Sequence, residues 1–276
     1  MRLRADRVDV RAALPDAIEV EWSADAERVT WSVANGSDGP VAVDAVALIA
    51  RLDGAIEPLQ VLRQGYQSWS PTAVATFRVD QDPSRARGAR SLSIGMHHAD
   101  WEPAEPDELR SELVTALRDA TGSVIVAGFL GGWEHDGTFR VRPARDGSDA
   151  IEVWIEAYLG GAVLDSTERR ELHDVSLAVG EHDPSPLLER WAGALGEIGS
   201  ARTMAPFQVG WCSWYHYFHA ITEADLRSNL ARAAAWPFDV FQLDDGYQPA
   251  IGDWLTTNVD FPTSLDGLAA AIAAEG

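Results

Sequence analysis

Polar and apolar residues alternate along the first part of the chain in short runs that are typical of β-strands. The runs share β-branched or aromatic side chains on every second position. They are AIEVEW from Ala17, RVTWSV from Arg28, VAVDAVALIA from Val41, SVIVAGF from Ser123 and IEVWIEAY from Ile151. Clusters such as NGSDGP from Asn35, DATG from Asp119 and GGWEHDG from Gly131 separate them, and we interpret the first and last as hairpin turns. This spacing predicts an antiparallel β-sandwich domain over residues 1–183.

The pattern changes to a helical period after Pro184. LLERWAGAL from Leu187 predicts an amphipathic helix, and IGSARTMAP from Ile198 predicts a linker. Residues 184–205 are therefore expected to connect two domains. Residues 103–117 mix prolines with a pattern that fits helix and strand equally, so their structure stays open.

Residues 206–276 alternate short apolar runs with helical segments. The runs are FQVGWCS from Phe207 and FDVFQL from Phe238. A helix capped by Thr222, with Asp225 at its third position, follows the first run, and a helix capped by Ser264 follows the second. This order predicts parallel strands with crossover helices. Two such units cannot bury both faces of their own parallel strands. We therefore expect that a partner chain covers the strands or that the residues belong to a longer polypeptide. The helix that ends at Gly276 favours the longer polypeptide.

Composition narrows the possible partners. The net charge of −21 and pI near 4.5 predict a surface that repels phosphate backbones and anionic lipid, so we expect no nucleic-acid or membrane partner. The single cysteine, Cys212, excludes a disulfide within the chain and any site with several cysteine ligands. The first residues contain no apolar segment of signal-peptide length, and we expect a cytoplasmic protein.

Two adjacent carboxylates, Asp244 and Asp245, follow the second apolar run. Ligands of parallel α/β sheets sit at the carboxyl ends of strands, where this pair is expected. A retaining glycosidase needs carboxyls about 5 to 5.5 Å apart that flank the scissile bond, whereas neighbours at one strand end approach from one side. They suit the hydrogen bonding of adjacent hydroxyls, such as those of a sugar. The alternatives are Mg²⁺ binding with Asp253 and Asp260, and a solvated strand end.

An aromatic cluster, GWCSWYHYF from Gly210, follows the first apolar run. Its rings can stack on the apolar face of a sugar, and they can equally pack in a core or at its rim. We interpret Cys212 as a small apolar residue without a base partner. His216 and His219 are expected in a loop, as polar rim residues rather than metal ligands.

Several motifs resemble one family when they are taken in order. GWCSWYHYF from Gly210, PFDVFQLDDGYQ from Pro237, IGDW from Ile251 and the pair Phe261-Pro262 are similar to segments of the α-galactosidases of glycoside hydrolase family 36. GYQSWS from Gly65 is similar to a loop in the N-terminal domain of that family. The resemblance is strong over residues 206–276. In the first domain it depends mainly on the GYQSWS loop.

The resemblance implies an N-terminal β-sandwich followed by a (β/α)8 TIM barrel, of which residues 206–276 would be the first two βα units. It implies retaining hydrolysis of terminal α-galactosyl groups from galactose-containing oligosaccharides, with no cofactor. We assign no metal ligand. By position, Asp244 and Asp245 would hold galactose hydroxyls, and Trp214 and Tyr215 would line the pocket. Tyr66 and Trp254 are further candidates for its wall.

The resemblance also implies what these residues lack. In the family, the nucleophile is an Asp that ends the fourth barrel strand, and the acid/base is a later Asp, so both would lie beyond Gly276. We therefore assign no catalytic residue here and expect the 276-residue chain alone to be inert. A galactosyltransferase of the raffinose-synthase kind and a non-catalytic carbohydrate-binding protein are the alternatives.

Overall fold

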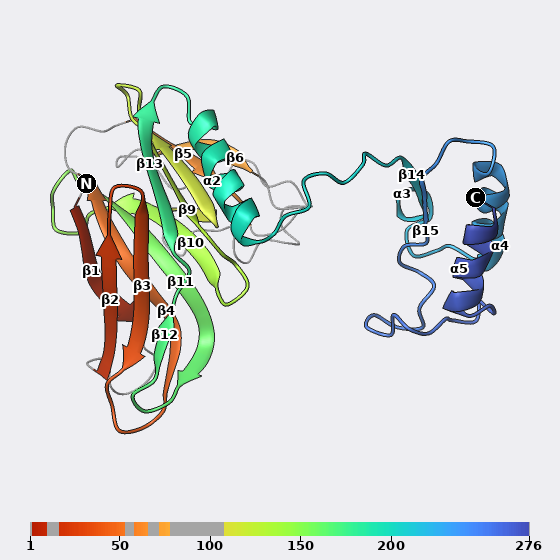
Figure 1. Ribbon diagram of the computed structural model, residues 1–276, viewed down its shortest axis with the longest axis horizontal. Helices are drawn as coiled ribbons and strands as arrows, with labels where there is room; N and C mark the ends of the chain where they lie inside the picture. The colour runs from red at the N-terminus through yellow and green to blue at the C-terminus, as the bar shows by residue number, and fades with distance from the viewer. Residues whose placement is uncertain (1, 10–16, 53–57, 66–71, 78–107, 276) are drawn as a thin grey trace. The chain divides into compact units, whose positions relative to one another are not determined.

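The computed structural model describes residues 2–9, 17–52, 58–65, 72–77 and 108–275, which fold as two compact units (Figure 1). Unit 1 is Met1–Ala201 and unit 2 is Arg202–Gly276. Unit 1 consists mainly of antiparallel β-sheet. All five runs that predicted strands form strands there, each beginning at the expected residue or one residue later.

The described strands of unit 1 form two antiparallel sheets. The first has the order β1 (Arg2–Asp9), β4 (Val41–Leu52), β11 (Ile151–Leu164), β10 (Asp136–Pro143) and β7 (Leu109–Glu112). The second has the order β12 (Arg169–Glu171), β3 (Arg28–Asn35), β13 (Val175–Glu181), β9 (Ser123–Phe129), β8 (Val114–Arg118), β5 (Leu59–Arg63) and β6 (Ala73–Phe77), with β2 (Ile18–Ala24) also paired to β3. The sequence leaves residues 103–117 open between helix and strand. In the part of them that the structure describes, β7 and β8 show that they are strand.

Both sheets contribute to one shared core, which makes unit 1 a β-sandwich as the alternation predicted. On β4, Val46, Leu48 and Ala50 face this core, together with Phe129 of β9 and Phe139 of β10. The intervening residues Ala47 and Ile49 pack with Trp154 in a separate cluster. This two-residue period is the one that the sequence pattern displays.

Helix α2 (Ser185–Ile198) covers part of the second sheet, beside strands β13 and β9 (Figure 1). Its residues Leu187, Leu188 and Trp191 pack against a second cluster of buried side chains on that sheet. The indole N–H of Trp191 donates to the carbonyl of Phe129 at 3.0 Å. The predicted amphipathic helix is therefore present and packs on the sandwich.

Two connections that we interpreted as hairpin turns link different sheets instead. The NGSDGP turn joins β3 of the second sheet to β4 of the first, and GGWEHDG joins β9 to β10 across the same gap. Asn35 explains the first connection, because the residue is 1% exposed and its side-chain amide donates to the carbonyls of Gly39 (2.8 Å), Leu164 (3.0 Å) and Asp165 (3.1 Å). A polar residue at the end of β3 thus ties the turn that follows it to the end of β11.

Unit 2 contains a parallel pair of strands, β14 (Gly210–Cys212) and β15 (Val240–Gln242). The short helix α3 (Trp214–Tyr217) and helix α4 (Glu223–Ala233) lie between them in the chain, and α5 (Leu265–Ala274) follows. The predicted caps are confirmed. Thr222 and Asp225 form a capping box at α4, and Ser264 accepts the N–H of Gly267 at 3.3 Å.

A small core holds unit 2 together. Ile221, Leu226, Phe261 and Leu268 are buried there. Trp211 of β14 stacks on Phe241 of β15, with ring centroids 4.3 Å apart and planes 13° from parallel. None of the helices in the part of the chain that the structure describes is both long and apolar enough to span a membrane.

Candidate functional site

The parallel pairing of β14 and β15 brings their carboxyl ends together. Cys212 lies opposite Gln242 in the register. Just beyond it, the N–H of Ser213 donates to the carbonyl of Gln242 at 3.1 Å, and the Ser213 hydroxyl accepts the N–H of Asp244 at 2.9 Å. Ser213, at the end of β14, therefore fixes the backbone of Asp244, at the end of β15.

The Asp244 carboxylate is held by groups of the chain on both oxygens. Its Oδ2 accepts the side-chain amide of Gln242 at 2.9 Å and the thiol of Cys212 at 3.4 Å. Its Oδ1 accepts the N–H of Asp245 at 2.8 Å. These donors fix the orientation of the carboxylate and leave it lone pairs for a further donor.

Cys212 therefore has a polar role that the sequence analysis missed. We interpreted it as an apolar residue, but its thiol is a hydrogen-bond donor to Asp244. Burial raises the pKa of the Cys212 thiol, and the Asp244 carboxylate beside it raises that pKa further. A thiol in this environment stays protonated, so it acts as a donor and is not a nucleophile.

Asp245 differs from Asp244 in how its two oxygens are used. Its Oδ1 accepts the N–H of Gly246 at 3.1 Å and a bond from the side-chain amide of Gln248. Its Oδ2 has no hydrogen-bond partner among the described residues, and the residue is only partly buried. Asp245 therefore presents a free acceptor at the strand end.

The loop after the pair requires a glycine. Gly246 has φ +116°, a conformation that L side chains rarely adopt, and a Cβ there would lie 2.7 Å from the carbonyl oxygen of His219. Asn258 holds the same loop from across, because its side-chain amide donates to the carbonyls of Gly246 (2.9 Å) and Gln248 (3.4 Å).

The predicted aromatic residues have different surroundings. Trp214 begins α3 directly after the Ser213 that bonds Asp244, and its ring packs edge-on against Phe218 with centroids 5.4 Å apart. The Tyr215 side chain is 86% exposed. Trp254 is 46% exposed, and its carbonyl accepts the hydroxyl of Tyr247 at 3.0 Å, which brings it near the loop of the carboxylate pair.

The remaining predictions concern His216, Tyr66 and a possible metal site. His216 lies in α3 rather than in the expected loop. Tyr66 lies outside the described residues. Within the described ranges, no group of three or more His, Cys, Asp or Glu is arranged to hold a metal ion.

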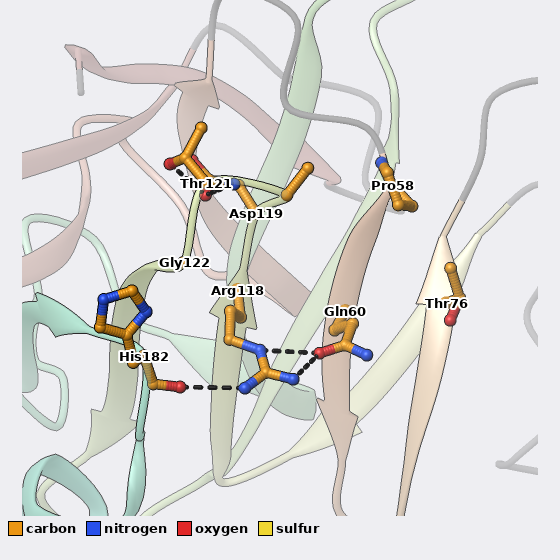
Figure 2. Close-up of a pocket in the computed structure, with 9 residues that line it drawn as sticks. Pro58, Gln60, Thr76, Arg118, Asp119, Thr121, Gly122 and His182 are labelled. Atoms are coloured by element: carbon orange, nitrogen blue, oxygen red, sulfur yellow. Dashed lines mark hydrogen bonds between the residues drawn. The ribbon is translucent and has the colours of Figure 1, made fainter.

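Unit 1 contains a cleft of about 530 Å³ at the turn between β8 and β9 (Figure 2). The Arg118 guanidinium donates to Gln60 Oε1 at 2.7 Å and to the carbonyl of His182 at 3.0 Å. Asp119 Oδ1 accepts the N–H groups of Thr121 (2.8 Å) and Ser123 (2.9 Å). Asp119 thus holds the turn, and Arg118 links Gln60 of β5 to the carbonyl of His182.

Solved structures that match this fold include several α-galactosidases. TtGalA from Thermus thermophilus, in complex with p-nitrophenyl α-D-galactopyranoside, matches with a TM-score of 0.54 and 25% identity over 90% of this chain and 45% of its own. The galactosidase domain of the α-galactosidase–sucrose kinase AgaSK matches with a TM-score of 0.58 and 15% identity over 94% of this chain and 37% of its own. The glycoside hydrolase family 36 α-galactosidase AgaA from Geobacillus stearothermophilus matches with a TM-score of 0.56 and 13% identity over 94% of this chain and 36% of its own. No family model matches the sequence.

These likenesses define the class of protein. The chain is similar in fold to the N-terminal portion of glycoside hydrolases of the α-galactosidase kind, and it resembles those of family 36, as its motifs predicted. It spans less than half the length of each of these three enzymes.

Proposed function

We propose that this chain is the sugar-binding part of an α-galactosidase that hydrolyses terminal α-galactosyl groups with retention. TtGalA has been solved with an α-galactoside and with stachyose, which supports a galactose-containing oligosaccharide as the substrate. In this proposal Asp244 and Asp245 accept hydrogen bonds from sugar hydroxyls, and Trp214, Tyr215 and Trp254 contribute to the wall of the site. Tyr66 would join that wall.

The proposal assigns each part of the chain a place. Residues 1–183 are the sandwich domain, residues 184–205 link it, and residues 206–276 are the first two βα units of a (β/α)8 barrel. Several apolar side chains of unit 2 favour further barrel units around it, because they are largely exposed: Met204, Phe207, Ile251, Leu255 and Val259.

One observation carries the proposal more than any other. Two adjacent carboxylates stand at the carboxyl end of a parallel strand pair, and one of them keeps an unpaired oxygen, Asp245 Oδ2. A carboxylate oxygen in a partly buried strand end is a strong acceptor for a hydroxyl, because the bond to a charged acceptor is about twice as strong as a neutral one.

The test is substitution of the pair in the native polypeptide that carries these residues. We expect Asp244→Ala and Asp245→Ala each to lower galactose affinity by about tenfold or more, since each removes charge-assisted hydrogen bonds. Calorimetry with galactose and turnover of nitrophenyl α-galactoside are the measurements. Asp253→Ala, on the exposed loop that follows, is the matched control and should change neither. Unchanged affinity in both pair variants would contradict the proposal.

The purified 276-residue chain should show no hydrolysis of nitrophenyl α-galactoside, because a flanking pair of catalytic carboxyls is not assigned within it. A clear rate from this chain would show that the nucleophile and acid/base lie among the present residues. Galactose binding without turnover in the native polypeptide would favour the carbohydrate-binding alternative, and galactosyl transfer to an added sugar would favour the synthase.

A further inference from the structure

Gln248 closes a hydrogen-bonded ring around Asp245. Its side-chain oxygen accepts the N–H of Gly246 at 2.9 Å, and its side-chain nitrogen donates to Asp245 Oδ1. The same Gly246 N–H also reaches Asp245 Oδ1, at 3.1 Å. The carboxylate, one backbone amide and one side-chain amide therefore form a single local unit.

The chemistry of the partners fixes the orientation of the Gln248 amide. A backbone N–H needs an acceptor and an ionised carboxylate needs a donor, so the amide oxygen must face Gly246 and the amide nitrogen must face Asp245. The opposite orientation would place oxygen against oxygen and nitrogen against nitrogen. Asn258 adds support from outside this ring, because its amide donates to the carbonyls of Gly246 and Gln248.

We infer that Gln248 is a positioning residue that fixes the orientation of the Asp245 carboxylate plane toward the ligand. The torsion that turns a carboxylate has broad preferences, so the plane of an unsupported Asp carboxylate rotates easily. Gln248 holds one oxygen, Oδ1, in a fixed plane and leaves the other, Oδ2, as the acceptor for a sugar hydroxyl. This inference rests on the proposed function, and it adds a determinant of sugar affinity that does not itself touch the sugar.

Three substitutions in the native polypeptide test this role. Gln248→Met keeps the length of the side chain and removes both hydrogen bonds. Gln248→Glu keeps the acceptor for Gly246 and replaces the donor by a second carboxylate, which repels Asp245 when both are ionised. Gln208→Glu makes the same chemical change on an exposed residue before the amino end of β14 and serves as the control.

Galactose affinity is measured by calorimetry at pH 7.5 and pH 5.0, always relative to the wild type at the same pH. We expect Gln248→Met to bind about tenfold more weakly at both pH values. Gln248→Glu should lose at least as much at pH 7.5 and regain most of it at pH 5.0, because two adjacent carboxyls share a proton as the pH falls and the protonated Glu again donates to Asp245. Gln208→Glu should match the wild type throughout.

The outcomes separate this inference from the proposed function. Wild-type affinity in both Gln248 variants, with galactose still bound, overturns the inference and leaves the proposed function intact. A Gln248→Glu defect that is equal at both pH values also overturns it, because a merely structural role would not follow protonation. A wild type that binds no galactose and turns over no galactoside removes the proposed function, and the inference with it.

Discussion

Gly128 shows how the absence of a side chain fixes the docking of a helix. It lies on β9 beneath α2, and a Cβ at this position would lie 2.2 Å from Nε1 of Trp191. That distance is shorter than any contact between such atoms, so an added methyl group must displace the indole. The indole in turn would lose its hydrogen bond to Phe129.

We therefore expect Gly128→Ala to lower the free energy of unfolding by about 2 to 3 kcal/mol through overpacking. Gly193 is the matched control, because it lies within α2 with no atom within 4 Å of its added Cβ. Gly193→Ala should raise stability by up to about 1 kcal/mol, since alanine favours the helix. Urea unfolding followed by tryptophan fluorescence measures both. Equal effects of the two substitutions would show that α2 does not dock as described.

At the site, the sequence predicted the acceptors but not the donors that orient them. Asp244 and Asp245 were identified because two charges after an apolar run are unusual at a strand end. Cys212 and Gln242 were not, because their role depends on the register of β14 and β15, which places them opposite each other. Gln248 is the last residue of the motif PFDVFQLDDGYQ. Its position three residues after Asp245 was the signal in the sequence that could have indicated their contact.

The alternation of polar and apolar residues predicts strands, but it does not predict which sheet each strand joins. The pattern located five strands of the sandwich, because the two-residue period reports which face of a strand is buried. It did not assign strands to sheets, since a turn of Gly, Asn and Asp can join neighbours in one sheet or cross between two. The DATG turn joins the paired strands β8 and β9, whereas NGSDGP crosses from β3 to β4.

The crossing from β9 to β10 is held by two buried histidines. His135 Nε2 accepts the N–H of His173 at 2.9 Å, and His173 Nε2 accepts the N–H of Glu134 at 3.1 Å. Both imidazoles must therefore be neutral with the proton on Nδ1, and that of His135 donates to the carbonyl of Asp136 at 2.9 Å. Burial lowers the pKa of both histidines, although the carboxylates of Glu134, Asp136 and Asp174 partly oppose this.

The sign of the pH effect follows from those lowered pKa values. The unfolded chain takes up protons below about pH 6.5, the ordinary histidine pKa, before the folded chain does. The stabilisation is therefore present above that pH and is lost as the pH falls toward the lowered pKa of the folded state. The loss is at most about 1.4 kcal/mol per pH unit for each histidine.

Replacing one histidine should reduce this pH dependence. We expect the free energy of unfolding to fall less between pH 7.5 and pH 5.5 in His135→Gln than in the wild type, with urea unfolding as the measurement. Groups common to both proteins cancel in the difference. Among them are the buried Glu108 and the partly buried Glu112, whose pKa values burial raises. Identical slopes would mean that His135 is not held neutral.

At the scale of the whole molecule, the two units differ in how well they cover their own apolar residues. The large core of unit 1 and the cluster under α2 are built entirely from residues before Ala201. Unit 2 has one small cluster, and Phe207, Leu255 and Val259 are about nine-tenths exposed. The first unit has the core of an independent domain, and the second does not.

Expression of the units separately tests this difference. Residues 1–201 should give a monomeric protein with a single cooperative unfolding transition, whereas residues 202–276 should aggregate or fail to unfold cooperatively. Size-exclusion chromatography and thermal unfolding are the measurements, with the 276-residue chain as the reference. A well-behaved second segment would argue against the need for further barrel units around it.

Asn35 has a consequence for how the protein can be produced. Asn35-Gly36-Ser37 is an acceptor sequence for N-linked glycans, yet in the folded chain its amide nitrogen is buried and shared among three carbonyl groups. A eukaryotic secretory host would meet this sequence before the sandwich closes, and a glycan attached then would occupy the nitrogen that the two sheets require. Glycan occupancy at this asparagine would mark molecules that cannot reach the native state, so secretion from such a host calls for Ser37→Ala, which removes the acceptor sequence and keeps the buried amide.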